Sequence, residues 1–168
     1  MEITIRLAVP ADAPDMAEVH ARSWEAAYKD ILSAEYIREK NATRPAMWQR
    51  SLAEGQYPHR VIQLNGKTVG NMCVDSPRDD DADDDCYELQ GIYLHPDYYR
   101  RGIGTQAVNF AFDMARSLGK RAMLVWVFAE NTNSINFYKK CGFAADGKTM
   151  IQNRGGKDVE AIRMRREL

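Results

Sequence analysis

A strand, a glycine-rich turn, an amphipathic helix and a second strand follow one another between residues 86 and 128, and this succession constrains the fold most. Residues 86–94 read as the first strand. After Gly102, apolar residues recur at helical spacing as far as Gly119, a natural helix stop. Residues 121–128 form a nearly continuous apolar run, which is typical of a buried strand. Because a strand–helix–strand crossover joins parallel strands, the sequence predicts one parallel pair within a mostly antiparallel sheet.

Turn residues and alternation indicate further strands on both sides of this crossover. Residues 3–7 alternate between apolar and polar and predict a first strand. Asn65 and Gly66 tolerate positive φ, so they predict a tight hairpin between the apolar stretches 60–64 and 67–74. The remaining predicted elements are a helix over about 132–140, ending at Gly142, and two strands joined by residues 153–156.

Three helices are predicted before the hairpin. Asp12, followed by a proline and an acidic residue, marks the start of the first one. Ser33 and Thr43 are suited to cap two shorter helices, the second of which ends at Gly55. The predicted order is therefore β-α-α-α-β-β-β-α-β-α-β-β. With no internal repeat or linker in between, we expect a single domain over residues 1–168.

Composition narrows the class of protein. The chain has 168 residues, 45% of them hydrophobic, which is enough for one proper core. A net charge of −1 gives no reason to expect a nucleic-acid partner. No signal core and no membrane-length apolar run is present, and the three cysteines lack C-x-x-C spacing. We therefore expect a cytoplasmic protein without a membrane partner or a metal site, whose thiols are reduced and buried.

The turn at Gly102 and Gly104 is suited to an anion. Unpaired backbone N–H groups and the helix dipole favour negative charge there, and Arg100 and Arg101 add positive charge. An ordinary glycine-rich helix start is the alternative, and the loop alone leaves both open. A dinucleotide-binding loop fits badly, because residues 95–101 separate the strand from the glycines. No Gly-Lys-Ser/Thr follows, which excludes a nucleoside-triphosphate loop.

Two longer stretches carry a resemblance to a known family. ELQGIYLHPDYYRRGIGTQAV (88–108) and NTNSINFYKKCGF (131–143) resemble the two signature blocks of the GNAT superfamily of acetyl-CoA-dependent N-acetyltransferases. SWEAAYKDIL (23–32) is similar to one branch of it. The resemblance implies the α/β (α+β) GNAT fold, a mixed, mostly antiparallel twisted sheet of about seven strands with one parallel pair and four to five helices.

The same resemblance implies how coenzyme A is held. The backbone N–H groups of Arg101–Thr105 would bind its pyrophosphate, and the strand at Ile92–Leu94 would pair with its pantetheine arm. Tyr99 and Arg100 depart from the family, which commonly has Gln or Arg and then a small residue there. Asn131 would bond to the cofactor arm or simply cap a helix. The expected cofactor-binding residues are Ile92, Tyr93, Leu94, Tyr99, Arg100, Arg101, Gly102, Ile103, Gly104, Thr105, Asn131 and Ser134.

Glu88 and Tyr138 are the predicted catalytic residues. An alkyl ammonium with a pKa near 10.4 costs about 4.6 kcal/mol to deprotonate at pH 7, so a base helps. Glu88 lies where some family members carry a catalytic glutamate, and the alternative is a salt-bridge partner. Tyr138 resembles the general acid that protonates the leaving sulfur, and the alternative is an aromatic residue packed against the sheet.

The acceptor is expected to be a primary amine of a small molecule or peptide. Trp24 and Tyr28 are candidate lining residues, together with Trp48, although at least one of the three is expected in the core. The loop 79–85 carries six carboxylates, so it is either a solvated loop or an attractor for a cationic acceptor. The sequence leaves a homodimer open. Alternative functions are a non-catalytic acyl-CoA-binding regulatory module and a nicotinamide-dependent oxidoreductase.

Overall fold

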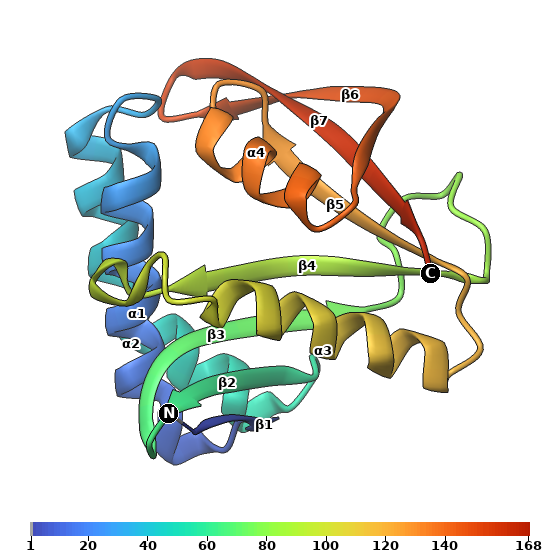
Figure 1. Ribbon diagram of the computed structural model, residues 1–168. Coiled ribbons are helices and arrows are strands. Elements are labelled where there is room, and N and C mark those ends of the chain that lie inside the picture. Colours follow the sequence, from blue (N-terminus) through green and yellow to red (C-terminus); the bar gives the residue numbers. More distant parts are fainter. Residues whose placement is uncertain (1) are drawn as a thin grey trace.

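In the computed structural model, which describes residues 2–168, seven strands form one mixed sheet in the order β1-β2-β3-β4-β5-β7-β6 (Figure 1). Neighbouring strands are antiparallel except β4 and β5, so the predicted sheet with one parallel pair is confirmed. The strands are β1 (Ile3–Leu7), β2 (His59–Leu64), β3 (Lys67–Asp75), β4 (Cys86–Leu94), β5 (Ala122–Phe128), β6 (Ala144–Arg154) and β7 (Lys157–Glu167).

Four α-helices flank the sheet in the part of the chain from residue 2 onward, two on each face (Figure 1). Val61 and Ile62 of β2 show the division, since neighbouring residues of a strand point to opposite faces. Val61 packs among residues of α1 and α2, whereas Ile62 packs in the main core with α3 and α4. The helices are α1 (Ala13–Tyr28), α2 (Ala34–Glu54), α3 (Ile103–Ser117) and α4 (Thr132–Lys140), with short 3₁₀ turns η1 (Pro10–Asp12) and η2 (Pro96–Tyr98).

The parallel pair is short, and the two strands then separate (Figure 1). Pairing of β4 with β5 runs from Cys86↔Ala122 to Glu88↔Leu124. On its other edge β4 stays paired with β3 as far as Leu94. The β4 edge that faces β5 therefore has no strand partner over residues 89–94 of the described sheet. Its backbone N–H and C=O groups are available to a ligand, because a strand edge is a row of unpaired donors and acceptors.

The prediction of two short helices between residues 33 and 55 is wrong. Ser33 caps α2 as expected, and its Oγ accepts a hydrogen bond from the Tyr36 N–H at 3.2 Å. Thr43 lies inside the same helix, where its hydroxyl donates to the Lys40 carbonyl at 2.7 Å. Pro45 follows within the helix and removes one N–H donor. Packing of α2 against α1 outweighs this local cost and keeps the helix continuous to Gly55.

The predicted hairpin turn and the predicted burial of the cysteines are confirmed. Asn65 and Gly66 have φ values of 49° and 82°, so both central turn residues are left-handed, as a two-residue hairpin requires. The three cysteines are buried free thiols. Within residues 2–168, no helix combines the length and the apolar character needed to cross a bilayer.

Candidate active site

The N-terminus of α3 presents unpaired backbone donors. Gly102 precedes the helix with φ 76°, and the first helical bond runs from the Gln106 N–H to the Gly102 carbonyl at 3.1 Å. The N–H groups of residues 103–105 therefore have no acceptor within the helix. No side chain of the described residues caps this end. Arg100, with φ 60°, and Arg101 are exposed beside it, so the turn combines free donors with positive charge.

The two glycines of this turn serve different purposes. A Cβ at Gly102 would meet no atom within 4 Å, so its positive φ is what favours glycine there. A Cβ at Gly104 would lie 3.3 Å from the Phe137 ring of α4. Gly104 therefore lets α3 approach α4 closely. One of the two glycines in the Gly102–Gly104 turn is thus required by helix packing and not by ligand binding.

The predicted residues of β4 point to both faces of the sheet. Ile92 and Leu94 pack against the core beneath α3. Tyr93 points the other way, where its ring stacks on His20 of α1 with centroids 3.9 Å apart. The backbone of all three residues pairs only with β3 in the described sheet. The free β4 edge thus lies where the sequence predicts pairing with a cofactor arm.

Tyr138 of α4 is buried in the main core. Its ring lies 5.4 Å from that of Phe137 and 5.7 Å from that of Phe143. Burial raises the pKa of Tyr138, and the nearby Tyr93 phenol raises it further. The phenol therefore keeps its proton at neutral pH, as a proton donor must. Tyr138 also packs in the core, which is the alternative role that the sequence analysis left open.

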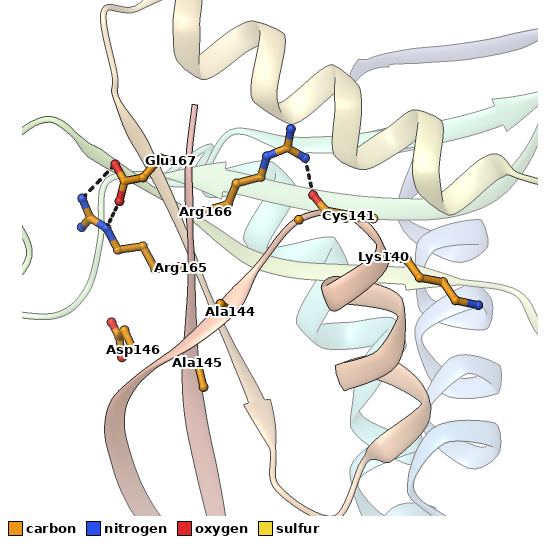
Figure 2. Close-up of a pocket in the computed structure, with 9 residues that line it drawn as sticks. Lys140, Cys141, Ala144, Ala145, Asp146, Arg165, Arg166 and Glu167 are labelled. Atoms are coloured by element: carbon orange, nitrogen blue, oxygen red, sulfur yellow. Dashed lines mark hydrogen bonds and ion pairs between the residues drawn. The ribbon is translucent and has the colours of Figure 1, made fainter.

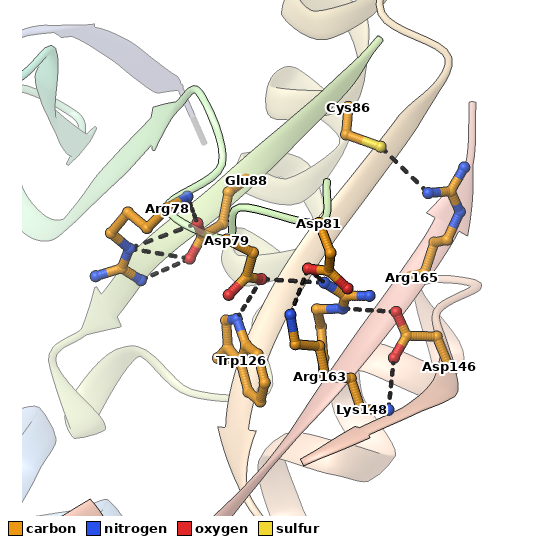
Figure 3. A network of polar contacts seen from close by, with 10 residues as sticks. All are labelled: Arg78, Asp79, Asp81, Cys86, Glu88, Trp126, Asp146, Lys148, Arg163 and Arg165. Atoms are coloured by element: carbon orange, nitrogen blue, oxygen red, sulfur yellow. Dashed lines mark hydrogen bonds and ion pairs between the residues drawn. The ribbon is translucent and has the colours of Figure 1, made fainter. Parts of the chain in front are cut away.

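Glu88 is fully buried and already paired (Figure 3). Its Oε1 accepts hydrogen bonds from Arg78 Nη2 at 2.5 Å and Nε at 3.2 Å, and its Oε2 accepts one from the Arg78 backbone N–H at 2.9 Å. The Arg78 side chain is 60% exposed on its outer side. The salt-bridge alternative for Glu88 is therefore observed. No local sequence pattern identifies Arg78 as this partner, because it stands in the loop before β4.

The acidic loop 79–85 is tied to the sheet rather than free in solvent (Figure 3). Asp79 accepts hydrogen bonds from Trp126 Nε1 at 2.9 Å and Arg163 Nη1 at 3.2 Å. Asp81 pairs with Lys148 and Arg163, and these contacts lower the pKa of its carboxyl group. Asp85 pairs with Arg121. Three of the six carboxylates are thus paired with cations of the protein, while Asp80, Asp83 and Asp84 are exposed to solvent. The loop is therefore solvated, as one of the two expectations has it, but it is anchored to the sheet.

Asn131 caps α4. Its Oδ1 accepts a hydrogen bond from the Ser134 N–H at 3.2 Å, so the capping alternative is observed. Tyr99 is 42% exposed beside the turn. The closest grouping of ligand-type atoms in residues 2–168 is that of Asp83, Asp85 and Cys86, within 4.8 Å of one another. Since Asp85 is engaged by Arg121, this grouping has the character of an ion-pair cluster.

Trp24 and Tyr28 lie together between α1 and the end of β5. Their rings meet edge to face at 5.1 Å, and Tyr28 lies 5.3 Å from Phe128. Trp48 is 4% exposed in the core between α1 and α2, so core packing is its role. The expectation that at least one of the three belongs to the core is confirmed.

Arg44 was missed by the sequence analysis. It is 6% exposed in α2, with its guanidinium carbon 4.2 Å from the Trp24 ring centroid. A signal for its burial exists, because Ile37, Arg44 and Trp48 are spaced by seven and four residues and share one helix face. The predicted helix break at Thr43 concealed that face.

An open hollow on the surface lies apart from these residues. It has a volume of about 740 Å³ and lies between the end of α4 and strands β6 and β7 (Figure 2). Arg165 and Glu167 pair along its wall, and Arg166 donates to the Cys141 carbonyl. None of the residues predicted for catalysis or binding lines it. The hollow is a surface concavity beside the sheet, while the candidate site is the β4–β5 gap.

Comparisons with known proteins agree with this geometry. The acetyltransferase (GNAT) family matches residues 15–143. An uncharacterized N-acetyltransferase, MJ1207 of Methanocaldococcus jannaschii, is 31% identical over 83% of this chain, which spans only 60% of that relative. The L-amino acid N-acyltransferase MnaT of Escherichia coli is 27% identical over 84% of this chain and 79% of its own length. The crystal structure of PaiA N-acetyltransferase from Thermoplasma acidophilum with coenzyme A superposes with a TM-score of 0.77 and 22% identity over the whole of both chains.

The family match covers most of the chain, including both signature blocks and the splayed strand pair. The predicted resemblance and the predicted enzyme class are therefore confirmed. The chain belongs to the GNAT family of N-acetyltransferases.

Proposed function

We propose that this N-acetyltransferase binds acetyl-CoA across the β4–β5 gap and passes the acetyl group directly to a primary amine of a small molecule or peptide. The observation that carries the proposal is the gap itself, with the free β4 edge on one side and the unpaired N–H groups of residues 103–105 at its end. These donors fit a pantetheine arm and a pyrophosphate. Arg100 and Arg101 add the charge that a pyrophosphate requires.

Acetyl-CoA supplies an acetyl group activated on sulfur. The amine nitrogen forms a bond to the thioester carbonyl carbon, the carbon–sulfur bond breaks, and the nitrogen loses a proton. Tyr138 holds its proton at neutral pH, so it is suited to protonate the departing thiolate. No covalent acetyl-enzyme is needed, because a neutral amine attacks a thioester directly.

Glu88 is our candidate for the base that accepts the amine proton. Arg78 occupies both of its oxygens, so Glu88 acts through a water molecule or after the exposed Arg78 side chain moves outward. Glu88 is fully buried at the last position where β4 pairs with β5, where the gap opens, and this position supports the assignment.

Rate measurements over a range of pH test both assignments. Glu88→Gln should flatten the low-pH limb of kcat/KM, because an amide cannot accept the amine proton. Tyr138→Phe keeps the packing and should lower kcat by about tenfold to a thousandfold. Glu54→Gln, an exposed change at the end of α2, is the control. An unchanged profile in Glu88→Gln would remove Glu88 from the mechanism.

A further inference from the structure

Buried polar atoms without a hydrogen-bond partner gather between α1, α2 and the Tyr93 side of β4. Within residues 2–168 these atoms are Nε and Nη2 of Arg44, Nε2 of His20, Nε1 of Trp24 and Oδ1 of Asn41. Buried polar groups in folded proteins are almost always paired. A cluster of unpaired atoms is therefore a place where a ligand or ordered water supplies the missing partners.

The cluster consists mainly of donors. Trp48 Nε1 donates to His20 Nδ1 at 3.3 Å, so the neutral ring of His20 carries its own proton on Nε2. Burial first, and the charge of Arg44 next, lower the pKa of His20 to about 3, which keeps the ring neutral. The N–H groups of His20, Trp24 and Arg44 outnumber the one unpaired acceptor, Asn41 Oδ1. Burial raises the pKa of the Tyr93 phenol and the nearby Trp24 N–H opposes this rise, but the two groups do not reach hydrogen-bond geometry. The missing ligand group is an acceptor.

Arg44 adds a full positive charge to these donors. Its Nη1 has only the Met47 sulfur at 4.0 Å, and its other two nitrogens have no partner. The Trp24 ring offsets part of the cost of burial. By contrast, Arg163, whose side chain is 11% exposed, forms ion pairs with Asp79, Asp81 and Asp146. The unmet charge of Arg44 therefore stands out among the described residues.

The cluster is continuous with the reaction region. His20 stacks on Tyr93 at 3.9 Å and meets Trp24 edge to face at 5.9 Å. Burial raises the pKa of Tyr28, the phenols of Tyr93 and Tyr138 raise it further, and the charge of Arg44 opposes them. Tyr28 therefore lies near both Arg44 and Tyr138, the predicted general acid.

We propose that Arg44 binds the carboxylate of an α-amino-acid acceptor, with the N–H groups of His20 and Trp24 completing its hydrogen bonds. This inference rests on the proposed acetyl transfer and names the class of amine. A carboxylate accepts two parallel hydrogen bonds from a guanidinium and carries one negative charge, which matches the single charge of Arg44. A polyamine or a lysine side chain would bring a second cation to a buried one.

The test compares acceptors that differ only in the carboxylate. Thiol release from acetyl-CoA is followed with L-amino acids, their carboxamides, spermidine and a lysine peptide. We expect kcat/KM for the acid to exceed that for its carboxamide by about 100-fold. Arg44→Met should remove this preference, Arg44→Lys should keep part of it, and Arg38→Met, an exposed change on α2, should leave it intact. The rise in melting temperature with acetyl-CoA should be the same in all of these variants.

The outcomes separate the two proposals. Equal use of acid and carboxamide, a preference for spermidine or the peptide, or an equal loss for both acceptors in Arg44→Met would overturn the carboxylate site and leave N-acetyl transfer standing. No thiol release with any amine would overturn the proposed reaction. The carboxylate site is then judged by the melting temperature with coenzyme A present, which L-amino acids should raise in the wild type and not in Arg44→Met. No rise in the wild type would overturn it.

Discussion

The two faces of the sheet differ in the polarity of the side chains that they bury. Beneath α3 and α4 the core is apolar, and the groups that we assign to cofactor binding are backbone atoms at a helix start and a strand edge. Between α1, α2 and β4, the buried residues include a histidine and an arginine whose polar atoms lack partners. The α3 face is therefore optimised for stability, while the α1–α2 face holds polar groups that only a ligand would satisfy. This difference predicts where mutations cost stability and where they cost only function.

The largest effect is expected on the α3 face. Phe112 is 2% exposed in the main core, 5.6 Å from the Phe143 ring and beneath the Arg166 guanidinium at 4.2 Å. Phe112→Ala should lower the free energy of unfolding by about 3–5 kcal/mol, because it leaves a cavity in a packed core. Urea denaturation measures this loss. A loss below about 1 kcal/mol would mean that the α3 face is loosely packed and would erase the contrast between the faces.

The next largest effect concerns pH and the α1–α2 face. The folded pKa of His20, about 3, lies below the ordinary value of 6.5, because burial disfavours the charged ring. Above pH 6.5 the ring is neutral in both states and contributes no pH dependence. As pH falls from 6.5 toward 3, the unfolded chain binds a proton that the folded chain does not, so stability is lost.

At pH 5 this loss should be about 2 kcal/mol relative to pH 7.5. The measurement is the difference in unfolding free energy between wild type and His20→Gln at both pH values, since groups common to both chains cancel. Between the two pH values the wild type should lose about 2 kcal/mol more than His20→Gln, which keeps the pH dependence of every other group. Equal slopes in the two proteins would show that His20 is not the buried neutral group described above.

The same contrast explains what the sequence predicts. The crossover from β4 through α3 to β5 and the turn at Asn65 and Gly66 were predicted correctly, because spacing and turn chemistry are local. The continuity of α2 past Pro45 was not predicted, because it depends on the packing of α2 against α1. The partnership of Glu88 with Arg78 and the isolation of Arg44 depend on side chains brought together by the fold. A site of backbone atoms can be read from a motif, whereas a pocket of distant side chains cannot.

A smaller effect is expected at the helix start on the α3 face. Gly102 has φ 76° and open space around its Cβ direction, so Gly102→Ala meets no clash. The left-handed conformation should cost about 1–2 kcal/mol in unfolding free energy. Any relaxation of the turn would redirect the N–H groups of residues 103–105, so acetyl-CoA should also bind more weakly. Calorimetric titration with acetyl-CoA checks this, and undiminished affinity would mean that the cradle lies elsewhere.

The smallest effect has the opposite sign and sharpens the comparison most. Arg44→Met replaces a buried, unpaired guanidinium with an unbranched apolar side chain of similar reach. The stacking on Trp24 is lost, which offsets part of the gain. We expect a net rise of about 1 kcal/mol in unfolding free energy, seen as a higher urea midpoint with an unchanged slope.

Arg38→Met, an exposed change on the same helix, should stay within about 0.5 kcal/mol of the wild type. A clear loss of stability in Arg44→Met would show that the guanidinium supports the fold through Trp24, and Arg44 would then be a structural residue. A gain in stability together with lost discrimination for the carboxylate would identify a residue kept for its ligand. Such a residue lowers the stability of the fold for the sake of function. The core beneath α3 contains no comparable residue among those described, because it consists of apolar side chains.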